Sequence, residues 1–386
     1  MSLPSNYDVA IIQNVIAPYK SLLFNTLKRE SGLRFKVIYL AKIEGNREWE
    51  IDIGELRFPH ELLFDGKIED VGQLELTLRV YKTLCANNPA VVVLGGYNHL
   101  VFWVGLVWAK VNRKKAILIN ESHYMDRRRW WFKEKVKQVL VSNCDAALVA
   151  GTRHKEYTVR LGLSPEKVFV KHGVGAIDVS WYQDAVRNYR KTKWNRAHGM
   201  KLRERNFLFV GRFSSEKNIM MLLRAFQRIK KNAAKEWGLI LVGNGPQRRE
   251  IENYVIQNQL DDVVLPGFKV GKELCLFYAL SDVLVLPSIS EPWGLVVNEA
   301  LACELPVIVS NRCGCFPDIV RDGINGFSFD PMDEEELSQR MSAFAHGRVD
   351  GEMMGQRSRQ IVAELTPSSI AATYREAITF VRVDAN

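Results

Sequence analysis

Two glutamates, Glu291 and Glu299, lie eight residues apart directly after the apolar run 283–286. This pattern predicts a buried strand, a turn that carries Glu291, and a short helix that begins near Gly294 and carries Glu299. The first N–H groups of a helix have no acceptor within the helix. They would therefore face whatever lies above the turn and attract an anion.

The two acids limit which anion could bind there. Carboxylates repel a bare phosphate, but they are strong acceptors for hydroxyl donors, so a phosphate whose neighbours carry hydroxyl groups is favoured. A sugar joined to a ribose through a diphosphate has this arrangement. The residues predicted to surround it are Glu291, Pro292, Trp293, Gly294, Leu295, Val296 and Glu299.

Other short motifs accompany the two acids in the second half of the chain. In order, they are GRFSSEKN at 211–218, VGNGP at 242–246, PGF at 266–268, the Glu-x7-Glu element, LPVI at 305–308 and DGINGF at 322–327. Two isolated acids would usually form part of a solvated helix face, but six motifs with compatible spacing are far more specific. Together they resemble the family-4 retaining glycosyltransferases of bacterial polysaccharide and glycolipid assembly. The resemblance implies that Glu291 holds donor-sugar hydroxyls and that Glu299 holds the ribose.

These residues must be positioned by a framework of strands and helices. Short, continuously apolar, β-branched runs are typical of strands that are buried on both faces. They occur at 9–13, 35–40, 91–94, 116–119, 146–149 and 168–170, and again at 207–210, 239–242, 263–265, 283–286 and 307–309. Helical patterns alternate with them, and one apolar stripe consists of Ile219, Leu222, Leu223, Phe226 and Ile229. The alternation predicts an α/β protein with two doubly wound parallel sheets.

The length of 386 residues is too great for one core and predicts two domains. We place a Rossmann-like domain at 1–175, a linker at 176–204 and a second Rossmann-like domain at 205–366. The linker is expected to contain a short helix near 181–189. Ligands of open α/β sheets bind beyond the carboxyl ends of the strands, so two facing sheets would define a central cleft. The resemblance implies the GT-B fold, with the acceptor on the first domain and the nucleotide sugar on the second. It also implies a last helix, here 367–386, that returns to the first domain.

Two cations, Arg212 and Lys217, follow the first strand of the second half. A departing nucleoside diphosphate gains negative charge, which fixed cations or a divalent metal can stabilise. No Asp-x-Asp follows an apolar strand, so we expect no metal and no cofactor besides the donor substrate. The resemblance implies that both cations grip the β-phosphate. It also implies retention by front-face attack, in which the leaving phosphate takes the acceptor's proton.

Glycines and an apolar loop complete the predicted donor site. Glycines at strand ends allow close backbone approach to a ligand, although a plain turn explains them equally simply. By resemblance, the loop 266–270 lies against the nucleobase. The residues concerned are Gly211, Gly243, Asn244 and Gly245, followed by Phe268 and Val270.

The first half offers three further candidates. Lys20 follows the first strand in a Pro-Tyr-Lys turn, and by resemblance it could reach the donor diphosphate; a solvated lysine at a helix start is equally consistent. The strand 116–119 leads into Glu121 and His123, one of which would face the donor sugar by resemblance. The sequence aligns neither uniquely, and a lone histidine is more often a structural residue.

The segment 126–137 is basic and aromatic. Trp130 follows three arginines at 127–129. This pattern fits a helix that contacts anionic lipid headgroups, and it fits equally well a Trp that stacks against a sugar ring. The third alternative is a solvated basic face with a partly covered Trp. The helical stripe that we expect to pack inward consists of Phe132, Val136, Val139 and Leu140. Earlier in the chain, 44–64 is predicted to be a long acceptor loop, with Arg47, Trp49 and His60.

The formal net charge is +9, which favours nucleic acid, an anionic membrane surface or phosphorylated small molecules as partners. We exclude nucleic acid because the chain has neither a zinc pattern nor an aromatic RNA-binding signature. Six scattered cysteines fit a reducing cytoplasm, and no apolar run is long enough to span a bilayer. We therefore expect a cytoplasmic enzyme that could bind peripherally at the inner membrane face.

The sequence thus predicts a metal-independent hexosyltransferase that uses a UDP-sugar, UDP-glucose as first choice, and a saccharide or lipid-linked saccharide acceptor. UDP is favoured over GDP only weakly, and the linkage and oligomeric state stay open. One alternative is a nucleotide-sugar epimerase of the same fold, against which the Glu-x7-Glu element argues. The other is an inactive sugar-nucleotide-binding relative, against which the intact Arg212, Lys217, Glu291 and Glu299 argue.

Overall fold

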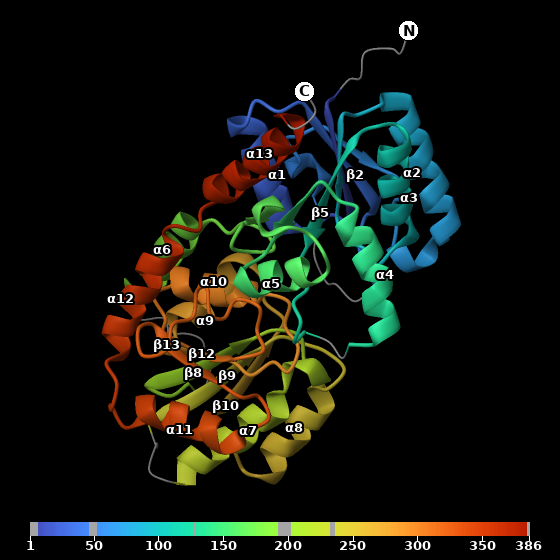
Figure 1. Cartoon of the computed structure of the whole chain (residues 1–386). Coiled ribbons are helices and arrows are strands. Elements are labelled where there is room, and N and C mark those ends of the chain that lie inside the picture. Colours follow the sequence, from blue (N-terminus) through green and yellow to red (C-terminus); the bar gives the residue numbers. More distant parts are fainter. Residues whose placement is uncertain (1–6, 46–51, 127–128, 192–201, 232–235, 384–386) are drawn as a thin grey trace. The chain divides into compact units, whose positions relative to one another are not determined.

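A computed structural model describes residues 7–45, 52–126, 129–191, 202–231 and 236–383. The chain forms two compact units, each built around a parallel sheet with helices on both faces (Figure 1). The first unit comprises Met1–Tyr124, Arg128–Ile177 and Leu365–Asn386; the second comprises Met125–Arg127 and Asp178–Glu364. The prediction of two doubly wound α/β domains is confirmed.

The sheet of the first unit has the strand order β3-β2-β1-β4-β5-β6-β7, and all its neighbours are parallel. Its strands are β1 (Val9–Val15), β2 (Phe35–Ala41), β3 (His60–Leu62), β4 (Val91–Leu94), β5 (Lys115–Asn120), β6 (Ala146–Val149) and β7 (Val168–Val170). The central strands are buried on both faces, as their continuous apolar runs predict.

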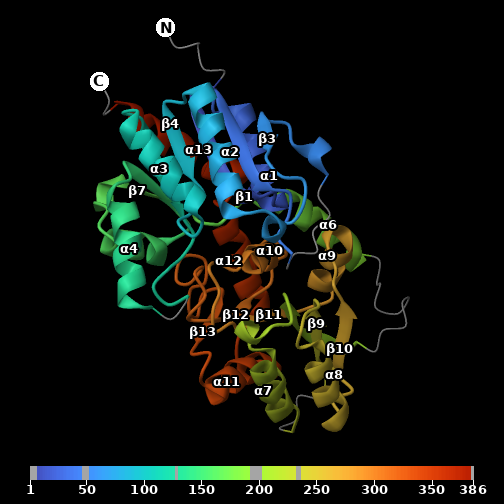
Figure 2. The same cartoon turned by 90° about the vertical axis from the view of Figure 1, so that its right-hand side faces the viewer.

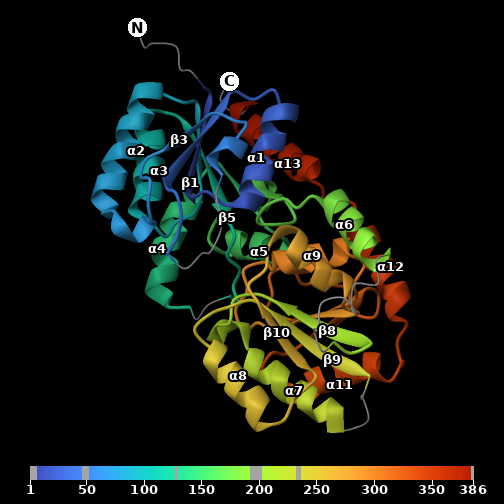
Figure 3. The ribbon, with the colours of Figure 1, turned by 180° about the vertical axis from the view of Figure 1, so that it is seen from behind.

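Helices cover both faces of this sheet. They are α1 (Pro18–Glu30), α2 (Gln73–Asn87), α3 (Leu100–Val111), α4 (Trp131–Ser142), α5 (Thr152–Arg160) and α13 (Pro367–Val383). One apolar core lies between the sheet and α2, α3 and α4. The other lies between the sheet and the pair α1 and α13, which pack side by side (Figure 3). The last helix is therefore part of the first unit.

The sheet of the second unit has the strand order β10-β9-β8-β11-β12-β13, again all parallel. Its strands are β8 (Arg205–Val210), β9 (Trp237–Val242), β10 (Val263–Gly267), β11 (Val283–Leu286), β12 (Val307–Ser310) and β13 (Gly326–Phe329). Its helices are α6 (Val179–Lys191), α7 (Ile219–Lys231), α8 (Arg248–Gln257), α9 (Gly271–Ala279), α10 (Leu295–Ala302), α11 (Glu334–Ala345) and α12 (Gly351–Val362). The predicted stripe on α7 is buried at all five positions.

Local sequence signals fix several helix starts. Pro18 opens α1 at a position where the missing N–H costs nothing. The side chain of Asp333 caps α11 by accepting from the N–H of Glu336, and Asp350 caps α12 in the same way through Met353. Short 3₁₀ turns occur at η1 (Ile53–Glu55), η2 (Ile68–Asp70), η3 (Pro165–Lys167) and η5 (Ser215–Lys217).

The structure differs from the sequence predictions at three places. The predicted acceptor loop 44–64 is not entirely a loop, because it contains η1 and the edge strand β3. A ring nitrogen of His60 hydrogen-bonds to the carbonyl oxygen of Phe58 at 3.0 Å. Arg47 and Trp49 lie outside the described residues. The strand β13 was not predicted either, since its sequence Gly-Phe-Ser-Phe is not a continuous apolar, β-branched run. Most of the predicted linker, including α6, groups with the second unit.

Candidate functional site

The sheet of the second unit has a topological switch point between β8 and β11. From β8 the chain proceeds outward through β9 and β10, and then returns to the other side of β8 to continue through β11, β12 and β13. In open α/β sheets, ligands bind beyond the carboxyl ends of the strands at such a point. The loops that follow β8 and β11 are the ones that carry the predicted cations and Glu291.

Lys217 and Glu291 meet across this switch point. Lys217 closes η5 in the β8 loop, Glu291 lies in the turn after β11, and their side chains form an ion pair. The two loops are also joined by a hydrogen bond from the N–H of Ile289 to the carbonyl of Glu216 at 2.8 Å. The Lys217 and Glu291 side chains are only 18% and 11% exposed.

Burial alone would lower the pKa of Lys217, but the charge of Glu291 and its hydrogen bond raise that pKa above the ordinary lysine value. The lysine is therefore firmly cationic. Arg212 lies on the same loop and is exposed.

The start of α10 lies directly beyond Glu291. Gly294 precedes the helix with φ of +97°, a conformation that favours glycine, and no side chain caps this end. The backbone of the turn is held by the loop after β12, since the N–H of Gly314 donates to the carbonyl of Glu291 at 2.9 Å and that of Cys315 donates to the carbonyl of Trp293 at 3.1 Å. The buried indole N–H of Trp293 donates to Asn298 on α10 at 2.8 Å. The turn is thus rigidly built, with the helix amides uncapped by a side chain.

Glu299 lies on α10, as predicted, and meets two tyrosines that the sequence did not single out. The hydroxyl of Tyr278, on α9, donates to the Glu299 carboxylate at 2.7 Å, and Tyr182, on α6, also hydrogen-bonds to Glu299. Burial raises the pKa of Glu299, and these two hydrogen bonds partly oppose the rise. Tyr182 lies in the predicted linker, where no motif marks it.

Two glycines of the predicted donor site, Gly243 and Gly245, are required by close contacts within the protein itself. A Cβ on Gly243, whose φ is +147°, would lie 1.8 Å from the carbonyl oxygen of Gly211. A Cβ on Gly245 would lie 2.5 Å from the carbonyl oxygen of Phe213, whose N–H donates to the carbonyl of Asn244 at 2.8 Å. The close approach that these glycines allow is therefore between two loops of the protein.

The loop after β10 presents apolar surface at the same edge of the sheet. Phe268 is 42% exposed and Val270, which precedes α9, is 53% exposed. Leu295 and Val296 are half-buried and Pro292 is exposed. Within the described residues, no group of three or more His, Cys, Asp and Glu side chains is arranged to hold a metal ion.

The first unit brings Lys20 and Glu121 together with a residue that the sequence did not indicate, Lys171. The Lys20 ammonium donates to Gln13 at 3.0 Å and to Glu121 at 3.3 Å, and that of Lys171 lies 3.4 Å from Glu121. Lys171 follows β7 and has a fully buried side chain, while Glu121 is 25% exposed. Burial lowers the pKa of Lys171 to about 8, and the Glu121 carboxylate opposes the decrease. For Glu121 itself, burial would raise the pKa, but the two lysines hold it below its ordinary value.

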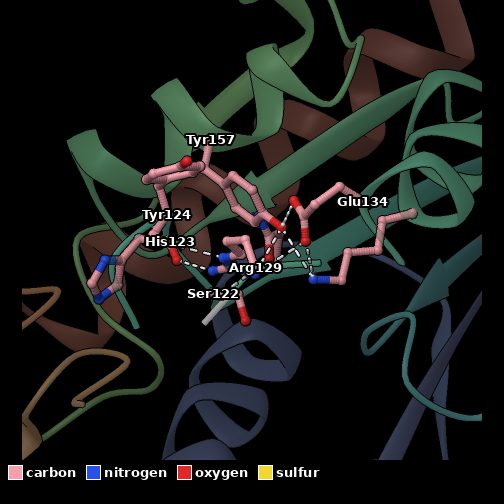
Figure 4. A network of polar contacts seen from close by, with 8 residues as sticks. Ser122, His123, Tyr124, Arg129, Glu134 and Tyr157 are labelled. Carbon is pink, nitrogen blue, oxygen red and sulfur yellow. Dashed lines mark hydrogen bonds and ion pairs between the residues drawn. The ribbon is translucent and has the colours of Figure 1, made fainter. Parts of the chain in front are cut away.

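His123 is fully buried, and its ring packs edge to face against that of His154, with the ring centroids 5.2 Å apart. Figure 4 shows how its loop is held: the Arg129 guanidinium donates to the carbonyls of His123 and Tyr124 and to the hydroxyl of Tyr157. Arg129 therefore has a structural task and is not part of a solvated basic face. Its neighbours Arg127 and Arg128 lie outside the described residues.

The comparison with known families identifies part of the chain. Residues 190–361 match the sequence profile of the family described as "Glycosyl transferases group 1". The chain contains a glycosyl transferases group 1 domain. This group 1 domain holds the Lys217–Glu291 pair, α10 and Glu299.

Relatives and solved structures extend the comparison. The chain is 33% identical over 156 residues to the sulfoquinovosyl transferase SQD2 of Arabidopsis thaliana, covering 40% of this chain and 29% of that one. It is 25% identical over 279 residues to the alpha-monoglucosyldiacylglycerol synthase of Acholeplasma laidlawii, covering 68% of each. The chain spans less than half the length of several curated relatives that it matches.

The fold of the whole chain resembles that of Anabaena Alr3699/HepE, solved in complex with UDP, with a TM-score of 0.76 at 16% identity. The alignment covers 96% of this chain and 99% of that one. The protein therefore has the GT-B fold, as the sequence predicted. The roles of the individual site residues stay predictions.

Proposed function

We propose that the protein is a retaining glycosyltransferase of the family-4 type, whose Glu-x7-Glu element is formed by Glu291 and Glu299. It transfers a hexosyl unit from a UDP-sugar, with UDP-glucose as first choice, to a saccharide or lipid-linked saccharide. Support comes from the group 1 domain and from fold neighbours solved in complex with UDP and with UDP-glucose. The printed name of one relative describes glucosylation of a diacylglycerol lipid.

The observation that carries the proposal is the Lys217–Glu291 ion pair at the switch point of the second sheet, beside the start of α10. A cation, a carboxylate and helix amides from two adjacent loops match the charge pattern of a sugar diphosphate. Lys217 and the helix amides suit the diphosphate, and Glu291 suits the hydroxyls of the sugar.

In the proposed reaction, the acceptor hydroxyl attacks the anomeric carbon on the face from which the diphosphate departs. The bond between that carbon and the β-phosphate oxygen breaks, a new carbon–oxygen bond forms, and the proton of the acceptor passes to the leaving phosphate. Lys217, Arg212 and the α10 amides stabilise the charge that grows on the diphosphate, so no metal is required. Glu299 accepts hydrogen bonds from the ribose hydroxyls, with Phe268 and Val270 against the base.

In the first unit, we assign the substrate contact to Glu121 and not to His123. Glu121 is half-buried, ionised and bracketed by Lys20 and Lys171, whereas His123 is fully buried against His154. The two lysines keep the carboxylate charged, which makes it a strong acceptor for a sugar hydroxyl.

We also place the enzyme in the reducing cytoplasm at the inner membrane face. All six cysteines are free thiols, which suits such a compartment. No helix in the described part of the chain is long and apolar enough to cross a bilayer.

The test is slow hydrolysis of a panel of UDP- and GDP-sugars in the presence of EDTA, comparing wild type with Glu291→Ala. Glu273→Ala is the matched control, because Glu273 also pairs with a lysine, Lys269, but is an exposed residue of α9. Release of UDP from one donor by wild type and the control alone would support the proposal. A changed sugar still attached to the nucleotide would identify an epimerase. UDP binding without turnover, even with candidate acceptors, would identify an inactive relative.

A further inference from the structure

The exposed apolar side chains of the described residues are concentrated on one part of the first unit. Ten of the twenty large hydrophobic side chains that are exposed lie on α2, α3 and α4. These three helices lie on the same side of the first sheet (Figure 2) and share one core beneath them. Scattered exposed apolar residues are normal, but a concentration of this kind marks an interaction site.

Helix α4 has the reverse of the usual orientation of a surface helix, because it exposes apolar side chains and covers charged ones. Two of its charged side chains face the protein: Glu134 accepts from the hydroxyl of Tyr157 at 2.7 Å, and Lys137 pairs with Glu134 at 2.8 Å (Figure 4). Both are only about one-fifth exposed, at 22% and 20%. By contrast, Trp131 is 79% exposed and Val136 is 54% exposed.

This orientation overturns the expectation that the apolar stripe of α4 packs inward. Of that stripe, only Leu140 is buried, whereas Phe132, Val136 and Val139 are 46%, 54% and 58% exposed. The reason is the polar network around Tyr157, which occupies the inner face of the helix and leaves the apolar residues outside. Trp130 is also exposed, at 51%.

Helix α3 is apolar on its outer side as well as its inner side. Leu100, Val107 and Val111 are 44%, 58% and 76% exposed, and they lie on one helical stripe. Lys110 is the single charged residue of the helix. A surface helix of a water-soluble domain normally carries polar residues on its outer side.

Helix α2 continues this surface, because it packs directly against α3. The indole N–H of Trp108 on α3 donates to the sulfur of Cys85 on α2 at 3.3 Å. Leu74 and Leu78, on α2, are 71% and 60% exposed. The outward side chains of the three helices, typified by Leu78, Val107, Val111, Trp131, Val136 and Val139, form what we term the α2–α4 face.

The charges on the α2–α4 face indicate its partner. The three helices, with the turn at 112–114 after α3, carry eight basic residues against two acidic ones. Both acids are already paired: Glu75 with Arg79 at 2.5 Å and Glu134 with Lys137. A second copy of the chain would present the same positive charge in a two-fold interface and be repelled. An anionic, partly apolar surface complements both properties.

We propose that the α2–α4 face docks on an anionic lipid bilayer. The exposed Trp131, Val107 and Val111 side chains enter the boundary between headgroups and acyl chains, and Lys133, Lys135 and Arg113 contact the headgroup phosphates. The inference is independent of the donor proposed above, since it concerns other residues of the first unit.

The test is co-sedimentation of the full chain with vesicles of phosphatidylcholine alone, or of phosphatidylcholine mixed with phosphatidylglycerol. The face variant is Val107→Ser, Val111→Ser and Trp131→Ser together. The matched control is Ile256→Ser with Met332→Ser, which removes apolar side chains that are 73% and 66% exposed on the second unit. A second variant, Lys133→Gln with Lys135→Gln, tests the charge.

Wild type and the control should bind the mixed vesicles, and the face variant should bind at least about tenfold more weakly. The charge variant should bind more weakly at low salt and approach wild type as salt rises. A far-ultraviolet circular dichroism spectrum and a melting temperature unchanged from wild type in every variant would show that folding is intact. Absence of vesicle binding by wild type would overturn the proposal. So would a wild-type dimer, seen by light scattering, that the face variant disrupts.

Discussion

Replacing Lys217 by methionine tests the ion pair at the switch point. Methionine retains most of the side-chain volume but leaves the Glu291 carboxylate without its cation. Breaking a fully buried pair costs about 3–5 kcal/mol, and an exposed pair contributes about 0–1 kcal/mol. With both side chains mostly but not fully buried, we expect a loss of about 2 kcal/mol in the free energy of unfolding. For a domain of this size, that loss lowers the melting temperature by about 4–8 °C.

The double variant Lys217→Met with Glu291→Gln separates stability from function. With no unpaired carboxylate, its melting temperature should return to within about 2 °C of wild type. Affinity for UDP should not return, because a charged hydrogen bond to the diphosphate contributes about 1.5–3 kcal/mol, or about 10- to 150-fold in Kd. Thermal melts and calorimetric UDP titrations of the four proteins in the cycle provide both quantities. Unchanged stability and unchanged UDP affinity in Lys217→Met would refute the reasoning.

Three further predictions follow from the same structure. Because burial raises the pKa of Glu299 in the folded state, its ionised form costs stability above the unfolded pKa, so Glu299→Gln should melt no lower than wild type at pH 7; its UDP affinity should still decrease about tenfold by calorimetry. Lys171 has a pKa lowered to about 8 in the folded protein, so between pH 8 and the ordinary lysine pKa the unfolded chain binds more protons than the folded one. Stability therefore rises with pH over this window, and the melting temperature of wild type should rise relative to that of Lys171→Met. A constant difference between the two melting temperatures would contradict the assignment. Gly243→Ala should lose about 3 kcal/mol or more, because its Cβ would overlap the Gly211 carbonyl, whereas Gly72→Ala, with nothing within 4 Å, should change stability by less than about 0.5 kcal/mol in urea titrations.

The sequence predicted the parts of the fold that depend on local pattern. Eleven apolar runs coincide with strands because strands buried on both faces need continuous apolar residues. The edge strand β3 escaped detection since His60, Glu61 and Leu62 are half-buried and carry no such run. The stripe on α4 was assigned to the wrong side because periodicity identifies a face but not its direction. That direction depends on Tyr157, which is distant in sequence.

In the candidate site, too, local features could be predicted from the sequence and contacts between distant residues could not. The positions of Glu291 and Gly294 in the turn after β11, and of Glu299 on α10, follow from local signals, and the structure agrees with them. Contacts made by residues far apart in the chain could not be predicted: Lys171 with Glu121, and Tyr182 with Glu299, join segments that carry no shared motif. The first contact depends on how parallel strands bring their carboxyl ends to one edge, and the second depends on the packing of α6 against α10.

The most direct test of the central claim is a crystal structure of the protein with UDP. We expect the diphosphate to lie against Lys217 and the first amides of α10, with the ribose hydroxyls bound to Glu299. The Lys217–Glu291 pair would open to admit the ligand. UDP bound away from the β8 and β11 loops, or contacting neither Lys217 nor Glu299, would contradict it.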